Sequence, residues 1–107
     1  MKMITAIVNK EETRTVCGAL IRAGFSVTRL STTGGFLMAG NTTLLMGVAD
    51  EKVEACLAVI RECCHQHTEV VPAVAGYSDS GPSVEPMEIT VGGATVFVTN
   101  VERFEKL

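Results

Sequence analysis

A glycine-rich stretch in the first half of the chain, TTGGFLMAGNTT at residues 32–43, organises the elements on both sides of it. Gly34 and Gly35 can adopt positive φ and leave backbone N–H groups uncovered, where an anion can bind. Phe36 offers a flat apolar face, and residues 41–43 offer hydrogen-bond donors and acceptors. This combination fits a ligand that is part anion and part aromatic ring, as a nucleotide is. The structural alternative is a hairpin loop with the glycines in the turn and Phe36 in the core.

Length and composition indicate a single globular domain over residues 1–107, with 47% hydrophobic and 20% charged residues. The net charge of -3 argues against non-specific nucleic-acid binding, which needs an excess of Lys and Arg. A small phosphorylated ligand held by backbone N–H groups stays compatible with this charge. The N-terminus lacks a signal-peptide pattern, and no apolar run is as long as a membrane span. We therefore expect a cytoplasmic protein.

Hydrophobic patterns around the stretch predict strands over residues 3–8, 25–30 and 42–48 and helices over about 10–23 and 50–65. We expect Asn9, with Glu12 three residues on, to cap the first helix and Asp50 to cap the second. Residues 88–91 and 94–98 are expected to form a last strand or strand pair, interrupted at Gly92-Gly93. The segment of about 68–87, rich in Gly, Ser and Pro, is expected to be a long loop before that strand.

The resulting order, βαββαβ, predicts an α+β fold of the ferredoxin-like type, with a four-stranded sheet and both helices on one face. By strand alternation, Thr28 lies on the face opposite Arg29. The helix-free face would carry apolar side chains, and self-association is the simplest way to cover such a patch.

No arrangement of nucleophile, base and orienting group is visible, so we do not expect an enzyme or a bound cofactor. Cys17 and Cys56 fall on the predicted core faces of the helices and are expected to be small buried hydrophobes. The run from Cys63 and Cys64 to His65 and His67 matches no standard zinc spacing. We expect packed thiols and solvated imidazoles there and no metal, while a metal or redox sensor is the alternative.

Several motifs together resemble one known family. They are MKMI at 1–4, AIV at 6–8, TTGGFL at 32–37, GNTT at 40–43, GV at 47–48 and VGGATVFV at 91–98. These resemble the PII-like cyclic di-AMP receptors of Gram-positive bacteria, and the similarity covers nearly the whole chain. The resemblance implies a PII-like subunit assembled as a homotrimer, with cyclic di-AMP in the clefts between subunits and an unidentified downstream protein.

The resemblance also implies the residues that contact the ligand. Thr28 would make polar contacts, residues 35–37 would wrap the ligand, and Asn41 would hydrogen-bond to it. Gly47 would line the pocket and Phe97 would pack near an adenine. The complete implied set is Thr28, Gly35, Phe36, Leu37, Asn41, Gly47 and Phe97.

The sequence departs from the family pattern at Gly24 and Ser26, where many members carry an Asn and an Arg that reach the nucleotide. An Arg–phosphate contact contributes roughly 1.5–3 kcal/mol. Two hypotheses follow. The first is a non-enzymatic signalling module that binds cyclic di-AMP, or a related adenine nucleotide, and orders its loops as output. The second is a trimeric scaffold that has lost the ligand and acts through protein contacts alone.

Overall fold

The structure, a computed structural model, describes residues 1–30, 40–78 and 81–107. Its elements are β1 (Lys2–Asn9), α1 (Thr13–Arg22), β2 (Thr28–Leu30), β3 (Asn41–Val48), the 3₁₀ helix η1 (Asp50–Lys52), α2 (Val53–Cys63), β4 (His67–Ser78), β5 (Gly81–Val91) and β6 (Ala94–Asn100).

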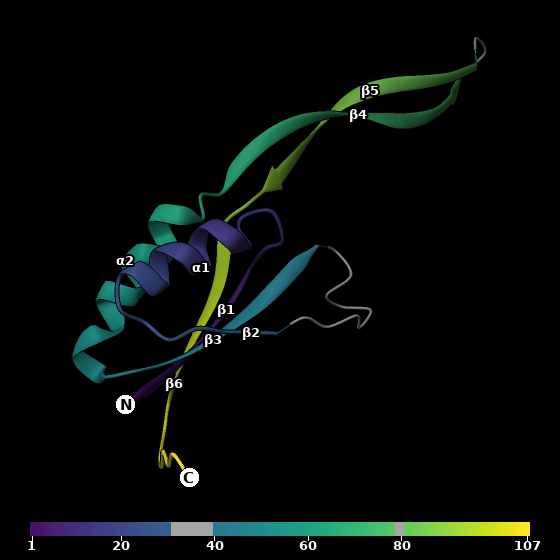
Figure 1. The fold of residues 1–107 in the computed structure, drawn as a ribbon. Coiled ribbons are helices and arrows are strands. Elements are labelled where there is room, and N and C mark those ends of the chain that lie inside the picture. The colour runs from purple at the N-terminus through teal and green to yellow at the C-terminus, as the bar shows by residue number, and fades with distance from the viewer. Residues whose placement is uncertain (31–39, 79–80) are drawn as a thin grey trace.

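The main sheet has the strand order β2-β3-β1-β6, and every neighbouring pair is antiparallel. Both helices lie on the same face of this sheet (Figure 1). The first strand therefore lies at the centre, between the third and the last strands of the βαββαβ order, as the ferredoxin-like arrangement requires. The expected fold class is confirmed.

The core forms where alternate residues of the two central strands point toward the helices. In β1 and β3 every second residue is buried, because side chains along a strand point to opposite faces in turn. Burying a side chain such as Ile4 or Leu44 contributes roughly 1.5–3 kcal/mol. The sheet contributes Ile4, Ala6, Val8, Leu44, Met46 and Val48 to the core. The helices contribute Val16, Leu20, Cys56 and Ile60, and Cys64 follows directly after α2.

The first helix begins later than expected, at Thr13. A turn precedes it, in which the Asn9 side-chain oxygen accepts a hydrogen bond from the backbone N–H of Glu11 at 2.9 Å. Asn9 thus stabilises the turn before the helix, and the expected cap on α1 is wrong because no side chain caps its first residue. The second expected strand is also shorter than predicted, since only residues 28–30 pair with β3.

Asp50 does not cap α2 either. Residues 50–52 form η1, and a carboxylate oxygen of Asp50 lies 2.7 Å from the N-terminal amine of Met1. This hydrogen bond and the positive charge of the amine hold the pKa of Asp50 below its usual value. The carboxylate therefore ties the chain terminus to the helix entrance.

The segment expected to be a long loop is instead a long β-hairpin, which is the main correction to the sequence-based prediction. β4 and β5 pair with each other from His67–Val91 to Ser78–Gly81, with a register shift between Val74 and Gly76. Pro72 lies directly opposite Pro86. Because opposed residues of an antiparallel pair exchange either both hydrogen bonds or none, two opposed prolines remove at most one rung of the ladder. The two prolines therefore do not prevent β4 and β5 from pairing.

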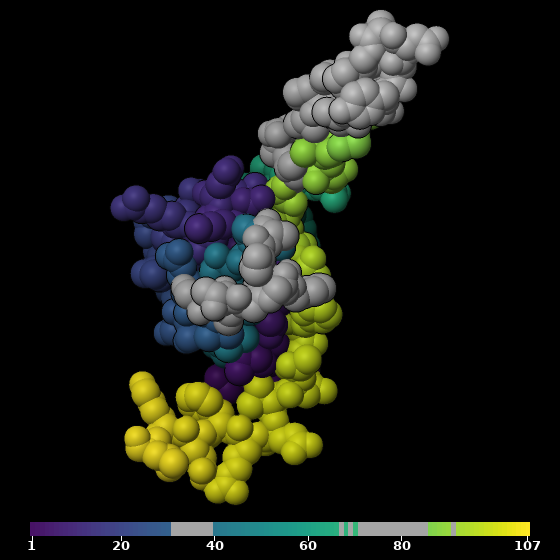
Figure 2. All heavy atoms as spheres, turned by 90° about the vertical axis from the view of Figure 1, so that its right-hand side faces the viewer, coloured from purple at the N-terminus to yellow at the C-terminus, as the bar shows by residue number. Residues whose placement is uncertain are grey.

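The hairpin extends away from the main sheet and pairs with none of its strands (Figure 1). At the other end of the molecule, residues 101–107 continue past β6 beyond the sheet (Figure 2). Neither α1 nor α2, nor any other helix in the described ranges, is long and apolar enough to span a membrane.

Candidate functional site

The helix-free face of the main sheet carries all four of the expected ligand-contacting residues that the structure describes. Thr28 lies on β2, Asn41 and Gly47 lie on β3, and Phe97 lies on β6. The strand register places them on the face opposite the buried Leu44. All four are exposed, including 54% of Phe97, which is unusual for a large aromatic side chain. The predicted opposition of Thr28 and Arg29 is confirmed by the pairing of Arg29 with Leu44.

One row of directly opposed residues crosses this face from edge to edge: Thr28, Leu45, Thr5 and Phe97. Neighbouring strands lie about 4.8 Å apart, so Thr28 and Phe97 are separated by about 14 Å. Thr28 is on one edge strand of the sheet and Phe97 is on the other. A single subunit therefore does not bring these two residues into one pocket.

Asn41 and Gly47 are also separated, because they lie near opposite ends of β3. At about 3.4 Å per residue the distance along the strand is about 20 Å. Each of them lines a different concave region, and Thr28 and Phe97 line neither of the two.

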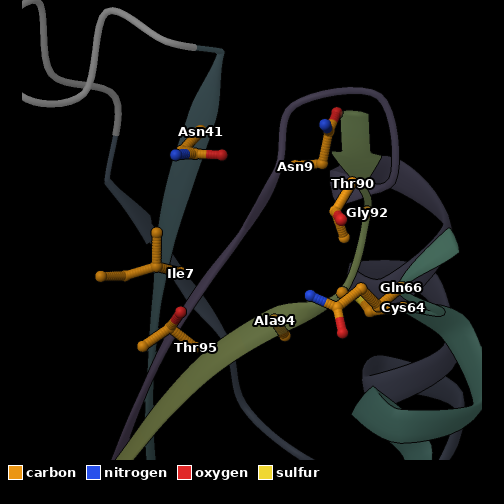
Figure 3. Close-up of a pocket in the computed structure, with 10 residues that line it drawn as sticks. Ile7, Asn9, Asn41, Cys64, Gln66, Thr90, Gly92, Ala94 and Thr95 are labelled. Carbon is orange, nitrogen blue, oxygen red and sulfur yellow. The ribbon is translucent and has the colours of Figure 1, made fainter. Parts of the chain in front are cut away.

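Asn41 lines a cleft at the foot of the hairpin, here called the hairpin cleft, with a volume of about 590 Å³. Figure 3 shows Asn41, Ile7 and Thr95 on one side of it and Asn9, Thr90, Gly92 and Gln66 on the other. Asn9 and Asn41 form the last opposed pair of β1 and β3. The residues lining the cleft are Ile7, Asn9, Asn41, Cys64, Gln66, Thr90, Gly92, Gly93, Ala94 and Thr95.

The turn from β5 to β6 forms one wall of the hairpin cleft and depends on its two glycines. Gly92 and Gly93 have φ values of 77° and 81°, which side chains rarely adopt. A Cβ on Gly92 would lie 2.3 Å from the His65 carbonyl oxygen and 2.9 Å from Oε1 of Glu12. The turn can therefore pack against the end of α2 only because residue 92 has no side chain.

Glu12 and Cys64 lie behind this turn. Oε2 of Glu12 is buried and accepts no hydrogen bond from another described residue. Burial, followed by hydrogen bonding and charge from Glu12, raises the pKa of the Cys64 thiol to about 12. The thiol is therefore protonated at neutral pH, and it is a structural neighbour of the cleft without nucleophilic character.

Gly47 lines a second concave region, the Gly47 groove, with a volume of about 500 Å³. Gly24 and Ser26 line the same groove, and Lys52 is the one charged residue among those that line it. A Cβ on Gly47 would lie 2.9 Å from Cε of Met1. The close approach to Gly47 within one subunit is thus made by the side chain of the first residue.

Gly35, Phe36 and Leu37 lie outside the described residues. Sequence reasoning missed Gln66, Thr90 and Thr95, and it assigned Asn9 only to a helix cap. What these residues share is that they are uncharged and polar and lie beside the Gly92-Gly93 turn or the end of α2. The sequence alone does not reveal this grouping, because residues 66 and 90 come together only when the hairpin forms.

The cysteines behave as packed side chains. Cys56 and Cys64 are buried, and Cys17 and Cys63 are half-buried against the core. His65 is exposed. Among the side chains that the structure describes, which do not include that of His67, no group of three or more His, Cys, Asp and Glu is placed to hold a metal ion.

Comparison with known proteins assigns the chain to a family. A family model described as "Cyclic-di-AMP receptor" matches residues 1–107. A similar solved structure is that of a functionally unknown protein from Pediococcus pentosaceus ATCC 25745, with a TM-score of 0.73 and 34% sequence identity. That likeness covers 99% of this chain and 96% of the other. The chain therefore belongs to the cyclic di-AMP receptor family.

Proposed function

We propose that this protein is a non-enzymatic cytoplasmic receptor that binds cyclic di-AMP in clefts between the subunits of a homotrimer. The observation that carries the proposal is the row across the helix-free face. Thr28 and Phe97 occupy opposite edges of one sheet, about 14 Å apart. In a ring each subunit presents one edge to the other edge of its neighbour, so the two residues converge only between subunits.

The proposed site is completed by residues from the segment before β3. Gly35, Phe36 and Leu37 would enclose the ligand from that segment, and Asn41 would hydrogen-bond to it. Binding would order the glycine-rich segment, and a downstream protein would read the change. Phe97 is exposed on the sheet face opposite the helices, which supports the burial of this surface between copies.

Calorimetric titration of the protein with cyclic di-AMP, ATP and AMP tests the proposal. We expect heat with cyclic di-AMP, and we expect Asn41→Ala to weaken binding by about tenfold, since removing one partner of a ligand hydrogen bond costs roughly 1–2 kcal/mol. Glu62→Ala, an exposed change on α2 away from the helix-free face, is the control. No heat with any of the three nucleotides at high protein concentration would remove the proposal.

A second candidate, a trimeric scaffold without a ligand, is favoured by the open space beside Gly24. No atom lies within 4 Å of a Cβ built on Gly24, so the Gly47 groove contains room where family members carry longer side chains. Under this second candidate, Asn41→Ala has no effect on nucleotide binding, because no nucleotide binds.

Ser26→Arg distinguishes the two candidates further: in a receptor it raises the affinity for cyclic di-AMP about tenfold or more through a phosphate contact. Ser26→Gln, similar in reach but uncharged, controls for size.

A further inference from the structure

The hairpin cleft is chemically unusual for a site that receives a dinucleotide, because none of the described side chains that line it is charged. Its polar lining consists of the amides of Asn9, Asn41 and Gln66 and the hydroxyls of Thr90 and Thr95. The carboxylate of Glu12 lies behind Gly92. A phosphate would gain no ion pair from the described lining and would be repelled by that carboxylate, so the cleft suits an uncharged polar group.

Gln66 is an exposed residue that lines the edge of this cleft. A Cβ on Gly93 would lie 3.3 Å from Cβ of Gln66, so the stem of Gln66 packs directly against the glycine turn. The amide at the end of the stem extends toward the cleft (Figure 3). No hydrogen bond to another residue of the described chain engages it.

Asn41 faces the cleft from the opposite side, and its amide is likewise not engaged by another described residue (Figure 3). Asn9 is different, because its side-chain oxygen already accepts the hydrogen bond from Glu11 at 2.9 Å. The cleft therefore presents two available carboxamides, one from β3 and one from the link between α2 and β4. A carboxamide offers a donor and an acceptor side by side, which matches the N6 amino group and N7 of adenine.

We propose that Gln66 is a specificity-determining residue of this receptor: its carboxamide, opposite that of Asn41, binds the edge of one adenine of cyclic di-AMP in the hairpin cleft, while the phosphates lie outside the cleft. The inference rests on the proposed function, since it names the part of the same ligand that enters this cleft. It also places the ligand against Thr90 and Gly92, at the foot of the hairpin.

The experiment compares cyclic di-AMP with cyclic di-IMP, which keeps the phosphates and ring system but replaces each adenine amino group with a carbonyl oxygen. Affinities of the full-length wild type, Gln66→Ala and Gln66→Glu are measured by calorimetry. We expect both variants to bind cyclic di-AMP about tenfold or more weakly, and Gln66→Ala to reduce the preference over cyclic di-IMP by at least about fivefold. Thr68→Ala, an exposed change two residues along the chain, should leave both affinities unchanged.

The outcomes distinguish the inference from the proposed function. If the wild type does not bind cyclic di-AMP, the proposed function fails. If the wild type binds cyclic di-AMP and both Gln66 variants bind it as tightly as the wild type does, the recognition of the base by Gln66 is overturned. It is also overturned if the Gln66 substitutions weaken the binding of cyclic di-AMP and cyclic di-IMP by the same factor. Melting temperature and sedimentation of each variant are measured alongside. The isosteric Gln66→Glu keeps the test decisive should the alanine variant fold poorly.

Discussion

Gly92 is the glycine of the candidate site with the least room for a side chain. Replacement with Ala places a Cβ 2.3 Å from the His65 carbonyl oxygen at a φ of 77°. We expect Gly92→Ala to lower the free energy of unfolding by about 2–4 kcal/mol through backbone strain and displacement of the end of α2. Urea unfolding measures the loss.

Gly24→Ala is a matched control, because Gly24 also has positive φ, of 94°, but nothing lies within 4 Å of its Cβ. This variant should lose only about 1–2 kcal/mol from strain alone. Equal losses at the two positions would contradict the role assigned to the contact with His65.

Cys64 makes the stability of the protein sensitive to alkaline pH. Its thiol has a pKa of about 12 in the folded protein, against an ordinary value of 9.0. Between about pH 9 and pH 12 the unfolded chain releases a proton that the folded protein keeps, so unfolding becomes more favourable as pH rises. The contribution is fully present below pH 9 and is lost as pH rises through this window.

The measurement is the free energy of unfolding of wild type and Cys64→Ala at a series of pH values. Other titrating groups affect both proteins alike, so the stability difference between them isolates Cys64. We expect the advantage of the wild type to shrink above about pH 9. A difference that stays constant up to pH 11 would show that the thiol titrates normally in the folded state.

Individual residues also show what the sequence could predict of the site. The separation of Thr28 and Arg29 onto opposite faces follows from strand alternation alone, and the register confirms it. The capping roles of Asn9 and Asp50 are wrong because each side chain has a different partner, the Glu11 N–H and the chain terminus. The second partner is distant in sequence, so no local pattern reveals it.

At the scale of elements, the two βαβ-type halves of the main sheet were predictable and the hairpin was not. Periodic apolar residues mark β1, β3 and α2, since each buries one face against the core. β4 and β5 form a separate two-stranded sheet, and Pro72, Gly76 and Pro86 interrupt their sequence pattern. Their pairing depends on the register between two strands, in which Pro72 meets Pro86 and a shift accommodates Gly76.

Hydrogen exchange should separate these elements. β1 is paired on both sides, with β3 and β6, whereas β4 and β5 pair only with each other. An isolated two-stranded hairpin is marginally stable in water, so we expect its amides to exchange orders of magnitude faster than those of β1. The comparison is made by mass spectrometry or NMR on the free protein. Protection of the hairpin equal to that of β1 would mean that another surface covers it.

At the scale of the whole molecule, the helix-free face predicts how copies associate. Phe97 is 54% exposed on this face, so Phe97→Asp should cost the isolated subunit little stability. In the proposed homotrimer, the same change would place a carboxylate in the interface between subunits, and we expect it to convert trimers into monomers. Sedimentation velocity tests this against Phe97→Tyr, which keeps the apolar ring. A Phe97→Asp protein that sediments as a trimer would show that association uses another surface.

If the subunits assemble in the proposed ring, the placement of Thr28 and Phe97 on opposite edges of the sheet has a genetic consequence. A chain with Thr28→Ala still carries an intact Phe97 edge, and a chain with Phe97→Ala still carries an intact Thr28 edge. In a mixed ring, one of the contacts between unlike chains unites the two intact edges and rebuilds a complete pocket. Two defective alleles expressed in one cell would therefore complement each other in part, although each alone fails.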